Sequence, residues 1–185
     1  MCQAPLVRKK AFFISDLMLL SARIADITSL EVDAIVNAAN EQLAPGGGVC
    51  GAIHRAAGGQ LADACGLLGG CPTGEARLTP GFQLPAKFVI HAVGPVWGGG
   101  GAGEADQLAA AYRATLQLAS GLGLRSLAFP AISTGIYGYP LREATEIAVR
   151  TVRQMLGAGS SVDQVIFACF TRDVLQAYRK AGVAA

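Results

Sequence analysis

The chain has 185 residues, enough for one full domain, and its apolar content of 52% excludes general disorder. Charged residues make up 15% and the net charge is +2, so electrostatics give no argument for direct nucleic-acid binding. No stretch approaches the roughly 20 apolar residues that a membrane span needs. The five cysteines form no CxxC pair, and with only two histidines no zinc-site spacing is present. We therefore expect a cytoplasmic protein with reduced thiols, no membrane association, no metal and no cofactor.

The first half of the chain alternates between strand and helix patterns. We interpret residues 1–16 as an N-terminal extension and residues 17–185 as a single domain. Strands are expected at residues 17–24 and 33–37, followed by a glycine-rich turn and a short helix that Gly58 and Gly59 end. Two more strands are expected at residues 75–79 and 87–93. This alternation is typical of a layered α/β fold.

The second half continues the alternation. A flexible glycine-rich connection at residues 98–103 leads into a helix whose apolar residues keep helical spacing from 108 to 119. A short strand follows at 127–129, then a helix from Pro140 to Gly157 and a buried strand at 165–168. Thr171 is placed to cap the last helix, which Gly182 closes.

Two glycine-rich loops share one arrangement, each between a predicted strand and a predicted helix. The first spans residues 45–49 and the second residues 133–138. Glycine allows the backbone to turn its N–H groups toward a ligand, and the N-terminus of the next helix adds positive potential. Neither loop is a P-loop or a GxGxxG motif. Together they could hold a diphosphate from opposite sides; tight turns without a ligand are an equally good interpretation of the residues alone.

Several motifs resemble the macrodomain family in residue type and order. They are Asp-Ile-Thr at 26–28, Val-Asp-Ala-Ile-Val-Asn-Ala-Ala-Asn at 32–40, Gly-Gly-Gly-Val at 46–49 and Ala-Ile-His-Arg-Ala-Ala-Gly at 52–58, with further matches at 71–74, 84–87, 91–95 and 129–135. The chain is most similar to the MacroD-type branch, which includes bacterial O-acetyl-ADP-ribose deacetylases. This resemblance implies a three-layer α/β/α sandwich with a central mixed, mostly parallel sheet and ADP-ribose in a cleft at one sheet end.

The resemblance also implies roles for individual residues. Asp26 would accept a hydrogen bond from the adenine amino group beside the Ile27 backbone; the alternative for Asp26 is a turn residue that caps the next segment. Asn40 would hold the distal ribose and orient the attacking water, whereas Asn37 would brace the end of its strand. The diphosphate would lie between Gly46, Gly47, Gly48 and Val49 on one side and Ser133, Thr134, Gly135, Ile136 and Tyr137 on the other.

Aromatic residues and histidines complete this interpretation. Tyr137 would also pack over the distal ribose. Phe170 would flank the adenine or, as an equal alternative, pack in the core. His54 and His91 have no acidic partner at a suggestive spacing, so we expect both to be hydrogen-bonded structural residues.

Cys50 departs from the family pattern. Many MacroD-type hydrolases carry Val-Asp-Gly where this chain has Val49-Cys50-Gly51, and the missing aspartate is the residue usually proposed to activate water. A thiol is mostly protonated at neutral pH and is therefore a poor base, although a helix N-terminus favours its ionised form. Cys50 is accordingly either a catalytic base or a small apolar filler, and we favour the filler. Pro45 is a lesser departure, which removes one N–H donor from the first loop.

The resemblance implies an ADP-ribosyl ester hydrolase with Asn40 and Cys50 at its catalytic centre. Its substrates would be O-acetyl-ADP-ribose or proteins mono-ADP-ribosylated on Asp or Glu. The alternative is a non-catalytic ADP-ribose reader, because the usual catalytic aspartate is Cys50. A third hypothesis, a regulatory partner in RNA processing, is weakened by the low charge and the lack of a basic face studded with aromatic residues.

Overall fold

The structure is a computed structural model that describes residues 20–156 and 160–184. The expected N-terminal extension, the first three residues of the expected first strand and Gly157 lie outside these residues. Within them, no helix has the length and apolar character needed to cross a membrane.

Six strands in the described residues form one sheet in the order β1-β6-β5-β2-β4-β3. They are β1 (Leu20–Ile24), β2 (Ala34–Ala38), β3 (Ala76–Pro80), β4 (Phe88–Ala92), β5 (Ser126–Phe129) and β6 (Gln164–Cys169). Every neighbouring pair is parallel except β3 and β4, which are antiparallel. The predicted mixed, mostly parallel sheet is therefore confirmed.

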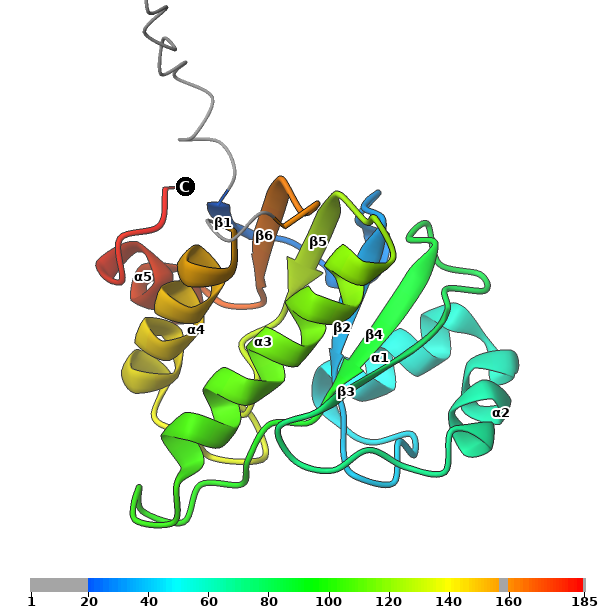
Figure 1. Ribbon diagram of the computed structural model, residues 1–185, viewed down its shortest axis with the longest axis horizontal. Helices are drawn as coiled ribbons and strands as arrows, with labels where there is room; N and C mark the ends of the chain where they lie inside the picture. Colours follow the sequence, from blue (N-terminus) through cyan, green and yellow to red (C-terminus); the bar gives the residue numbers. More distant parts are fainter. Residues whose placement is uncertain (1–19, 157–159, 185) are drawn as a thin grey trace, which may run out of the picture.

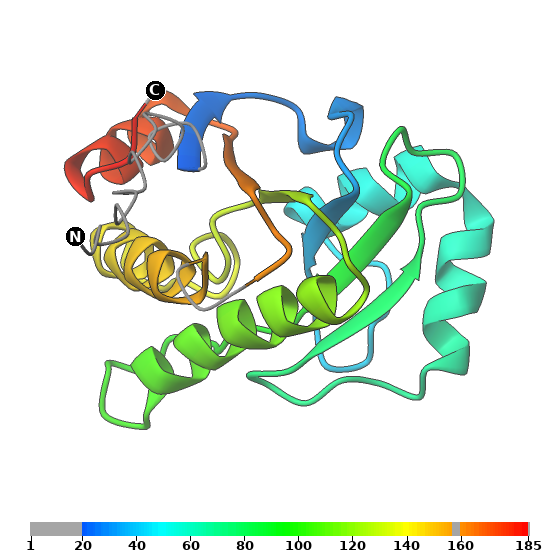
Figure 2. The same cartoon turned by 45° about the horizontal axis from the view of Figure 1, so that its top comes forward.

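Helices cover both faces of this sheet (Figures 1 and 2). One face carries α1 (Gly48–Ala57) and α2 (Gly59–Leu67); the other carries α3 (Glu104–Gly121), α4 (Leu141–Leu156) and α5 (Arg172–Lys180). Successive strand residues point to opposite faces, so Ala34 and Val36 of β2 join the core under α3 and α4, whereas Ile35 joins the core under α1. Burial on both faces explains the continuous apolar runs of the strands and confirms the three-layer sandwich.

Helix α2 was not predicted from the sequence. Gly58 ends α1 as expected, with φ at 84° and its N–H donating to His54 O at 3.2 Å, but the chain enters α2 at the next residue. Only Leu61 and Cys65, one turn apart, are buried in α2. Two buried positions give too weak a periodic pattern to outweigh the helix-breaking tendency of the surrounding glycines.

The strand order brings the two glycine-rich loops to the same edge of the sheet. From β2 the chain passes through α1 and α2 to β3 and β4 on one side, and later returns to β5 on the other side of β2. The connections after β2 and β5 therefore leave the sheet in opposite directions. In open α/β sheets, ligands bind in the crevice at the carboxyl ends of the strands where the order reverses. The first loop follows β2 and the second follows β5, so both border this crevice.

Candidate functional site

The first loop ends in a helix N-terminus that has no capping side chain. Gly47 is the N-cap of α1, and the first turn of the helix contains no acidic residue. The first N–H groups of a helix have no partner within it, and they carry partial positive charge. Gly48 has φ at 57°, a left-handed conformation that favours glycine. This end of α1 can therefore accept an anion from outside the helix.

Gly51 holds the first loop against the helix, a role that the sequence analysis missed. Its N–H donates to Gly47 O at 3.3 Å, and a Cβ atom on Gly51 would lie only 2.5 Å from Gly46 O. The loop carbonyl cannot move away from a larger residue without displacing the backbone of the loop. The sequence offered no signal beyond a glycine directly after Cys50.

The second loop also presents backbone donors. A hydrogen bond from Tyr139 N–H to Ser133 O (3.0 Å) closes it. In the part of the chain that the structure describes, the N–H groups of Gly135, Ile136 and Tyr137 donate to no other residue. Ser133 has φ at 67°, which is strained for a residue with a side chain and typical of functional loops.

Ser133 takes part in the second loop through its backbone, and its hydroxyl group is buried. The Ser133 side chain is buried against Gly94, where a Cβ atom would collide with Ser133 Oγ. The Oγ atom has no hydrogen-bond partner among the described residues. Gly94 lies just after the end of β4. A residue larger than glycine at this position would block the close approach of the second loop.

The two loops meet at their tips. A Cβ atom on Gly47 would lie 2.9 Å from Ile136 Cδ1, so the Ile136 side chain reaches across to the first loop. Ile136 is nevertheless 81% exposed, because it lies over the loop surface and not in the core. The structure thus brings together the two groups of residues that were predicted to hold a diphosphate.

Asn40 lies at the start of the first loop and braces it. Its Nδ2 donates to Ala44 O (2.9 Å), and its Oδ1 accepts from Ala44 N–H (3.0 Å). A primary amide has two N–H donors and two oxygen lone pairs, so one of each stays free for a ligand. The amide is therefore fixed in orientation by the loop and still able to bind.

Cys50 and Asn40 flank Gly46. A Cβ atom on Gly46 would lie 3.6 Å from Asn40 Nδ2 and 3.7 Å from Cys50 Sγ. The Cys50 thiol is buried and lies 3.7 Å from Ala44 O, to which it donates. The buried thiol packs beside the first loop, as the filler interpretation of Cys50 expects.

Asn37 links Cys50 to a buried histidine, as expected for a residue that braces the strand end. Its Nδ2 lies 3.6 Å from Cys50 Sγ and 3.1 Å from His91 Nδ1. His91 Nε2 is hydrogen-bonded to Thr79 Oγ1 at 3.0 Å. Burial, with a smaller contribution from the nearby His54 ring, lowers the pKa of His91 to about 4, so His91 is neutral at physiological pH.

The expectation for the two histidines is right for His91 and wrong for His54. His54 is buried, yet neither ring nitrogen has a hydrogen-bond partner in the described residues. Burial lowers the pKa of His54, because the charged ring would lose its hydration. Its position in α1 places it beside His91, with the ring centroids 6.5 Å apart.

Asp26 follows the end of β1, where it caps η2 (Ile27–Ser29). Its Oδ1 accepts from Thr28 N–H (2.9 Å) and Thr28 Oγ1 (2.7 Å). These bonds hold the pKa of Asp26 below its usual range, so the carboxylate is ionised at neutral pH. The capping alternative is thus confirmed. Both bonds use Oδ1, however, which leaves Oδ2 for a further donor.

Phe170 does not pack in the core. It follows β6 and is 91% exposed, and Ile24, the β1 residue paired with the preceding Cys169, is 51% exposed. The core alternative for Phe170 is therefore wrong. Ala25 N–H donates to Cys169 O (3.2 Å), so Phe170 lies close to the segment that leads to Asp26.

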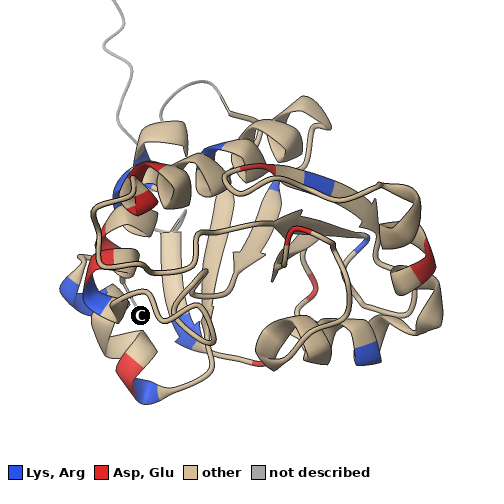
Figure 3. Cartoon of the chain, turned by 90° about the horizontal axis from the view of Figure 1, so that it is seen from below, with Lys and Arg blue, Asp and Glu red and all other residues tan. Residues whose placement is uncertain are grey.

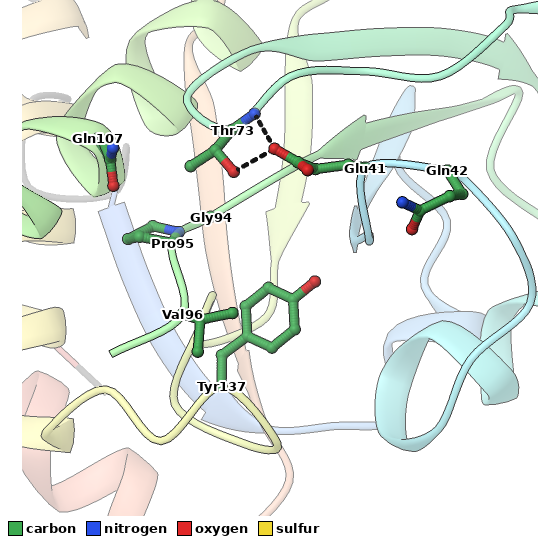
Figure 4. Close-up of a pocket in the computed structure, with 8 residues that line it drawn as sticks. All are labelled: Glu41, Gln42, Thr73, Gly94, Pro95, Val96, Gln107 and Tyr137. Carbon is green, nitrogen blue, oxygen red and sulfur yellow. Dashed lines mark hydrogen bonds between the residues drawn. The ribbon is translucent and has the colours of Figure 1, made fainter. Parts of the chain in front are cut away.

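A cavity of about 260 Å³ opens beside the two loops (Figure 4). It is lined by Glu41, Gln42, Thr73, Gly94, Pro95, Val96, Gln107 and Tyr137. Of these residues, the sequence analysis identified only Tyr137 as part of a site. The others come from four separate segments, and no local pattern could have joined them.

Charges are sparse at this end of the molecule. Viewed from below, Lys and Arg occur as separate short segments and form no continuous basic stripe across the described residues (Figure 3). No group of three His, Cys, Asp or Glu residues suited to a metal ion occurs within residues 20–156 and 160–184. The anion-binding character of the crevice therefore comes from backbone N–H groups.

A mostly parallel sheet with glycine-rich loops at the point where its strand order reverses is typical of nucleotide-binding α/β proteins. The family model described as Macro domain matches residues 36–148, so the chain belongs to the Macro domain family. It is 59% identical over 166 residues to a macro domain-containing protein of Chlorobaculum tepidum, covering 90% of this chain and 96% of the relative. It is 55% identical over 161 residues to a Klebsiella pneumoniae protein named O-acetyl-ADP-ribose deacetylase, covering 85% and 92%.

Solved structures resemble the chain over most of its length. The Oceanobacillus iheyensis macrodomain with ADP is 41% identical with a TM-score of 0.83, covering 86% of this chain and 87% of that one. The Trypanosoma brucei macrodomain in complex with ADP-ribose is 48% identical with a TM-score of 0.81, covering 86% and 67%.

Proposed function

We propose that this protein binds ADP-ribose in the crevice between the two glycine-rich loops. The observation that carries this proposal is that two loops with free N–H groups, after β2 and after β5, meet at Gly47 and Ile136. The diphosphate accepts hydrogen bonds from residues 46–49 on one side and 133–137 on the other. The adenine lies at the Asp26 end, where Oδ2 accepts from its amino group beside the Ile27 backbone and the exposed Phe170 ring covers one face.

We further propose that the bound molecule is an ester that the protein hydrolyses. The ester joins the distal ribose to a carboxyl group of acetate or of a protein Asp or Glu side chain. One water molecule adds across the cleaved bond, and the products are ADP-ribose and the free carboxylate with one proton released. Asn40 orients the water and the ribose hydroxyls, and the substrate's own phosphate helps to hold the water. Tyr137 packs over the distal ribose.

The second candidate function is a reader that binds ADP-ribose without turnover. Cys50 favours it, because the chain has a buried thiol where many MacroD-type hydrolases carry the aspartate that is proposed to activate water. A general base typically contributes about 10²- to 10⁴-fold to a rate, so its absence slows hydrolysis strongly without removing the contribution of a positioned water.

Two measurements on the purified protein test these proposals. Titration calorimetry with ADP-ribose should give a Kd of about 1 μM or lower, equivalent to about −8 kcal/mol. Turnover assays with O-acetyl-ADP-ribose and with a protein mono-ADP-ribosylated on Glu should release ADP-ribose. Binding without release from either substrate would leave only the reader function, and no heat or thermal shift with ADP-ribose would contradict both functions.

A further inference from the structure

The cavity lined by Glu41 and Tyr137 adjoins the proposed reaction centre but is not needed to bind ADP-ribose there. Glu41 directly follows Asn40, and Tyr137 belongs to the second loop. Tyr137 lines the cavity together with Glu41, and the pKa of its phenol is raised by burial and by the nearby Glu41 and Cys50. Tyr137 is thus a wall shared by the crevice and the cavity (Figure 4).

Glu41 is the one charged side chain among the described residues that line this cavity. Its Oε1 accepts from Thr73 N–H (3.1 Å) and Thr73 Oγ1 (2.8 Å), which fixes the carboxylate at the cavity wall (Figure 4). The four ion pairs found in residues 20–156 and 160–184 do not involve Glu41. Within the described residues, no Lys or Arg therefore lies within ion-pair distance of the Glu41 carboxylate.

The other residues that line the cavity also suit a cationic side chain. Gln42, Gln107 and Thr73 are neutral and polar, and their oxygen atoms can accept hydrogen bonds. Gly94, Pro95 and Val96 form an apolar side that can contact a methylene chain. A long basic side chain has this combination, with an apolar stem and a charged head that only donates hydrogen bonds.

The cavity has room for one long side chain. Its volume of about 260 Å³ lies just below the range of about 300–1,000 Å³ for sites that hold drug-sized ligands. An acetyl group is far smaller than the cavity and carries no charge for Glu41 to recognise.

We propose that this cavity is a subsite for a Lys or Arg side chain that neighbours the ADP-ribosylated carboxylate in a protein substrate. The inference rests on the proposed function and ranks its substrates: modified proteins with a basic residue beside the modified site are preferred. Specificity comes from Glu41, whose charge attracts the basic residue and repels an acidic one.

The test uses peptides mono-ADP-ribosylated on one Glu that differ only at a neighbouring position. That position carries Lys, its neutral isostere norleucine, or Glu. Fluorescence polarisation gives Kd for each peptide, and release of ADP-ribose gives kcat/KM. The Lys peptide should be favoured over the norleucine peptide about fivefold in Kd, as expected for one exposed charge pair, and the preference should shrink at 1 M salt.

Glu41→Gln should remove the preference for Lys, because Gln keeps the oxygen that accepts from Thr73 but carries no charge. Glu146→Gln is the matched control: it makes the same change on the exposed face of α4 and should keep the preference. Gln107→Lys, at an exposed position of α3 that lines the cavity, should reverse the preference toward the Glu peptide.

The outcomes separate this inference from the proposed function. Peptides that bind without turnover but with a Glu41-dependent preference would contradict the hydrolase and support the subsite. Turnover with equal Kd and kcat/KM for the Lys and norleucine peptides would support the hydrolase and overturn the subsite. A preference for Lys that survives Glu41→Gln would also overturn it, and a protein that does not bind ADP-ribose would contradict both.

Discussion

Ile136 Cδ1 lies only 2.9 Å from the position that a Cβ atom on Gly47 would occupy. The tip of the second loop therefore touches the backbone of the first, and a diphosphate between the loops requires the Ile136 side chain to move. Ile136 is 81% exposed, so little packing opposes this movement. Gly47 itself has no side chain to obstruct the diphosphate.

Gly47→Glu should lower the affinity for ADP-ribose at least tenfold. The new carboxylate stands at the N-terminus of α1, where it takes the place of the diphosphate and repels it. Titration calorimetry measures the loss. Gly47→Gln, which adds nearly the same bulk without charge, should lose less, so the difference between the two variants isolates the repulsion.

The matched control for this change is Gly59→Glu. Gly59 begins α2, and a Cβ atom there would meet nothing within 4 Å. A Glu in the first turn of a helix is also favourable to its dipole. Its affinity for ADP-ribose should equal that of the parent. A Gly47→Glu protein that binds as tightly as Gly59→Glu would contradict the assignment of the first loop to the diphosphate.

Asp26→Asn should weaken ADP-ribose binding by about tenfold while keeping the turn. The Asn oxygen still accepts from Thr28, whereas the amide nitrogen that replaces Oδ2 cannot accept from the adenine amino group. The expected loss is about 1–2 kcal/mol, the contribution of one charge-assisted hydrogen bond. Calorimetry with ADP-ribose and with ribose 5-phosphate measures it.

Ribose 5-phosphate lacks adenine, so its affinity should not change in Asp26→Asn. Asp26→Ala also removes the cap of η2, and it should lower the free energy of unfolding by about 1 kcal/mol where Asp26→Asn does not. Equal losses for both ligands would show that Asp26 acts only through the fold.

Asp33 joins three strands at the end of the sheet opposite the crevice. Its Oδ1 accepts from Lys87 Nζ (2.9 Å), and its Oδ2 accepts from the N–H groups of Arg125 (3.0 Å) and Ser126 (3.1 Å). The Lys87 ammonium, followed by the Arg125 N–H, lowers the pKa of Asp33 to about 2, despite an opposing effect of burial. An unfolded chain has an Asp pKa of about 3.9.

This shift predicts a loss of stability in acid. Because the folded pKa is depressed, the stabilisation is fully present above about pH 5 and is lost as the pH falls through about 4 toward 2. It amounts to at most about 2–3 kcal/mol, less what solvent screening of the exposed Lys87 removes. Urea unfolding at pH 7, 4 and 3 measures it.

In Asp33→Asn, the free energy of unfolding should be lower at pH 7 and should fall less steeply below pH 5. Asp63→Asn, on the exposed side of α2, should keep the slope of the parent. An Asp33→Asn protein with the same slope as the parent would show that other carboxylates cause the acid sensitivity.

The sequence was sufficient for the layered fold and for the meeting of the two loops. Buried strands such as β6 are short apolar runs between turn residues, and the glycines at 46–48 and 135 mark loops directly in the sequence. Features that depend on the approach of distant segments could not be predicted. Glu41 and Thr73, which hydrogen-bond at the cavity wall, are 32 positions apart.

One prediction, for His54, and one of the two alternatives for Phe170 failed for reasons that lie in side-chain direction. Phe170 continues the apolar run of β6, but it follows the last strand residue and points away from the core. His54 was expected to have a hydrogen-bond partner, yet its ring lies buried in α1 beside the His91 ring with neither nitrogen bonded among the described residues. Periodicity predicts which residues are buried, but not whether their polar atoms find partners.

Cys50→Asp should raise the rate of ester hydrolysis, by about 10²-fold or more. Cys50 is the third residue of α1, where a carboxylate is favourable to the helix dipole and lies beside Asn40 across Gly46. An ionised carboxylate there supplies the general base that the thiol does not. Release of ADP-ribose from O-acetyl-ADP-ribose measures the change.

Cys50→Ala and Asn40→Ala separate the role of the thiol from that of the amide. If Cys50 only fills space, Cys50→Ala should keep most of the parent rate, whereas Asn40→Ala should lose it, because the water is no longer oriented. If the thiolate acts as a base, Cys50→Ala should instead fall by about 10²-fold, and the parent rate should rise between about pH 7 and pH 9, where thiols ionise. An inactive parent that gains turnover in Cys50→Asp would show that this single position separates a reader from a hydrolase. No gain in Cys50→Asp, with ADP-ribose affinity retained, would show that position 50 does not reach the water.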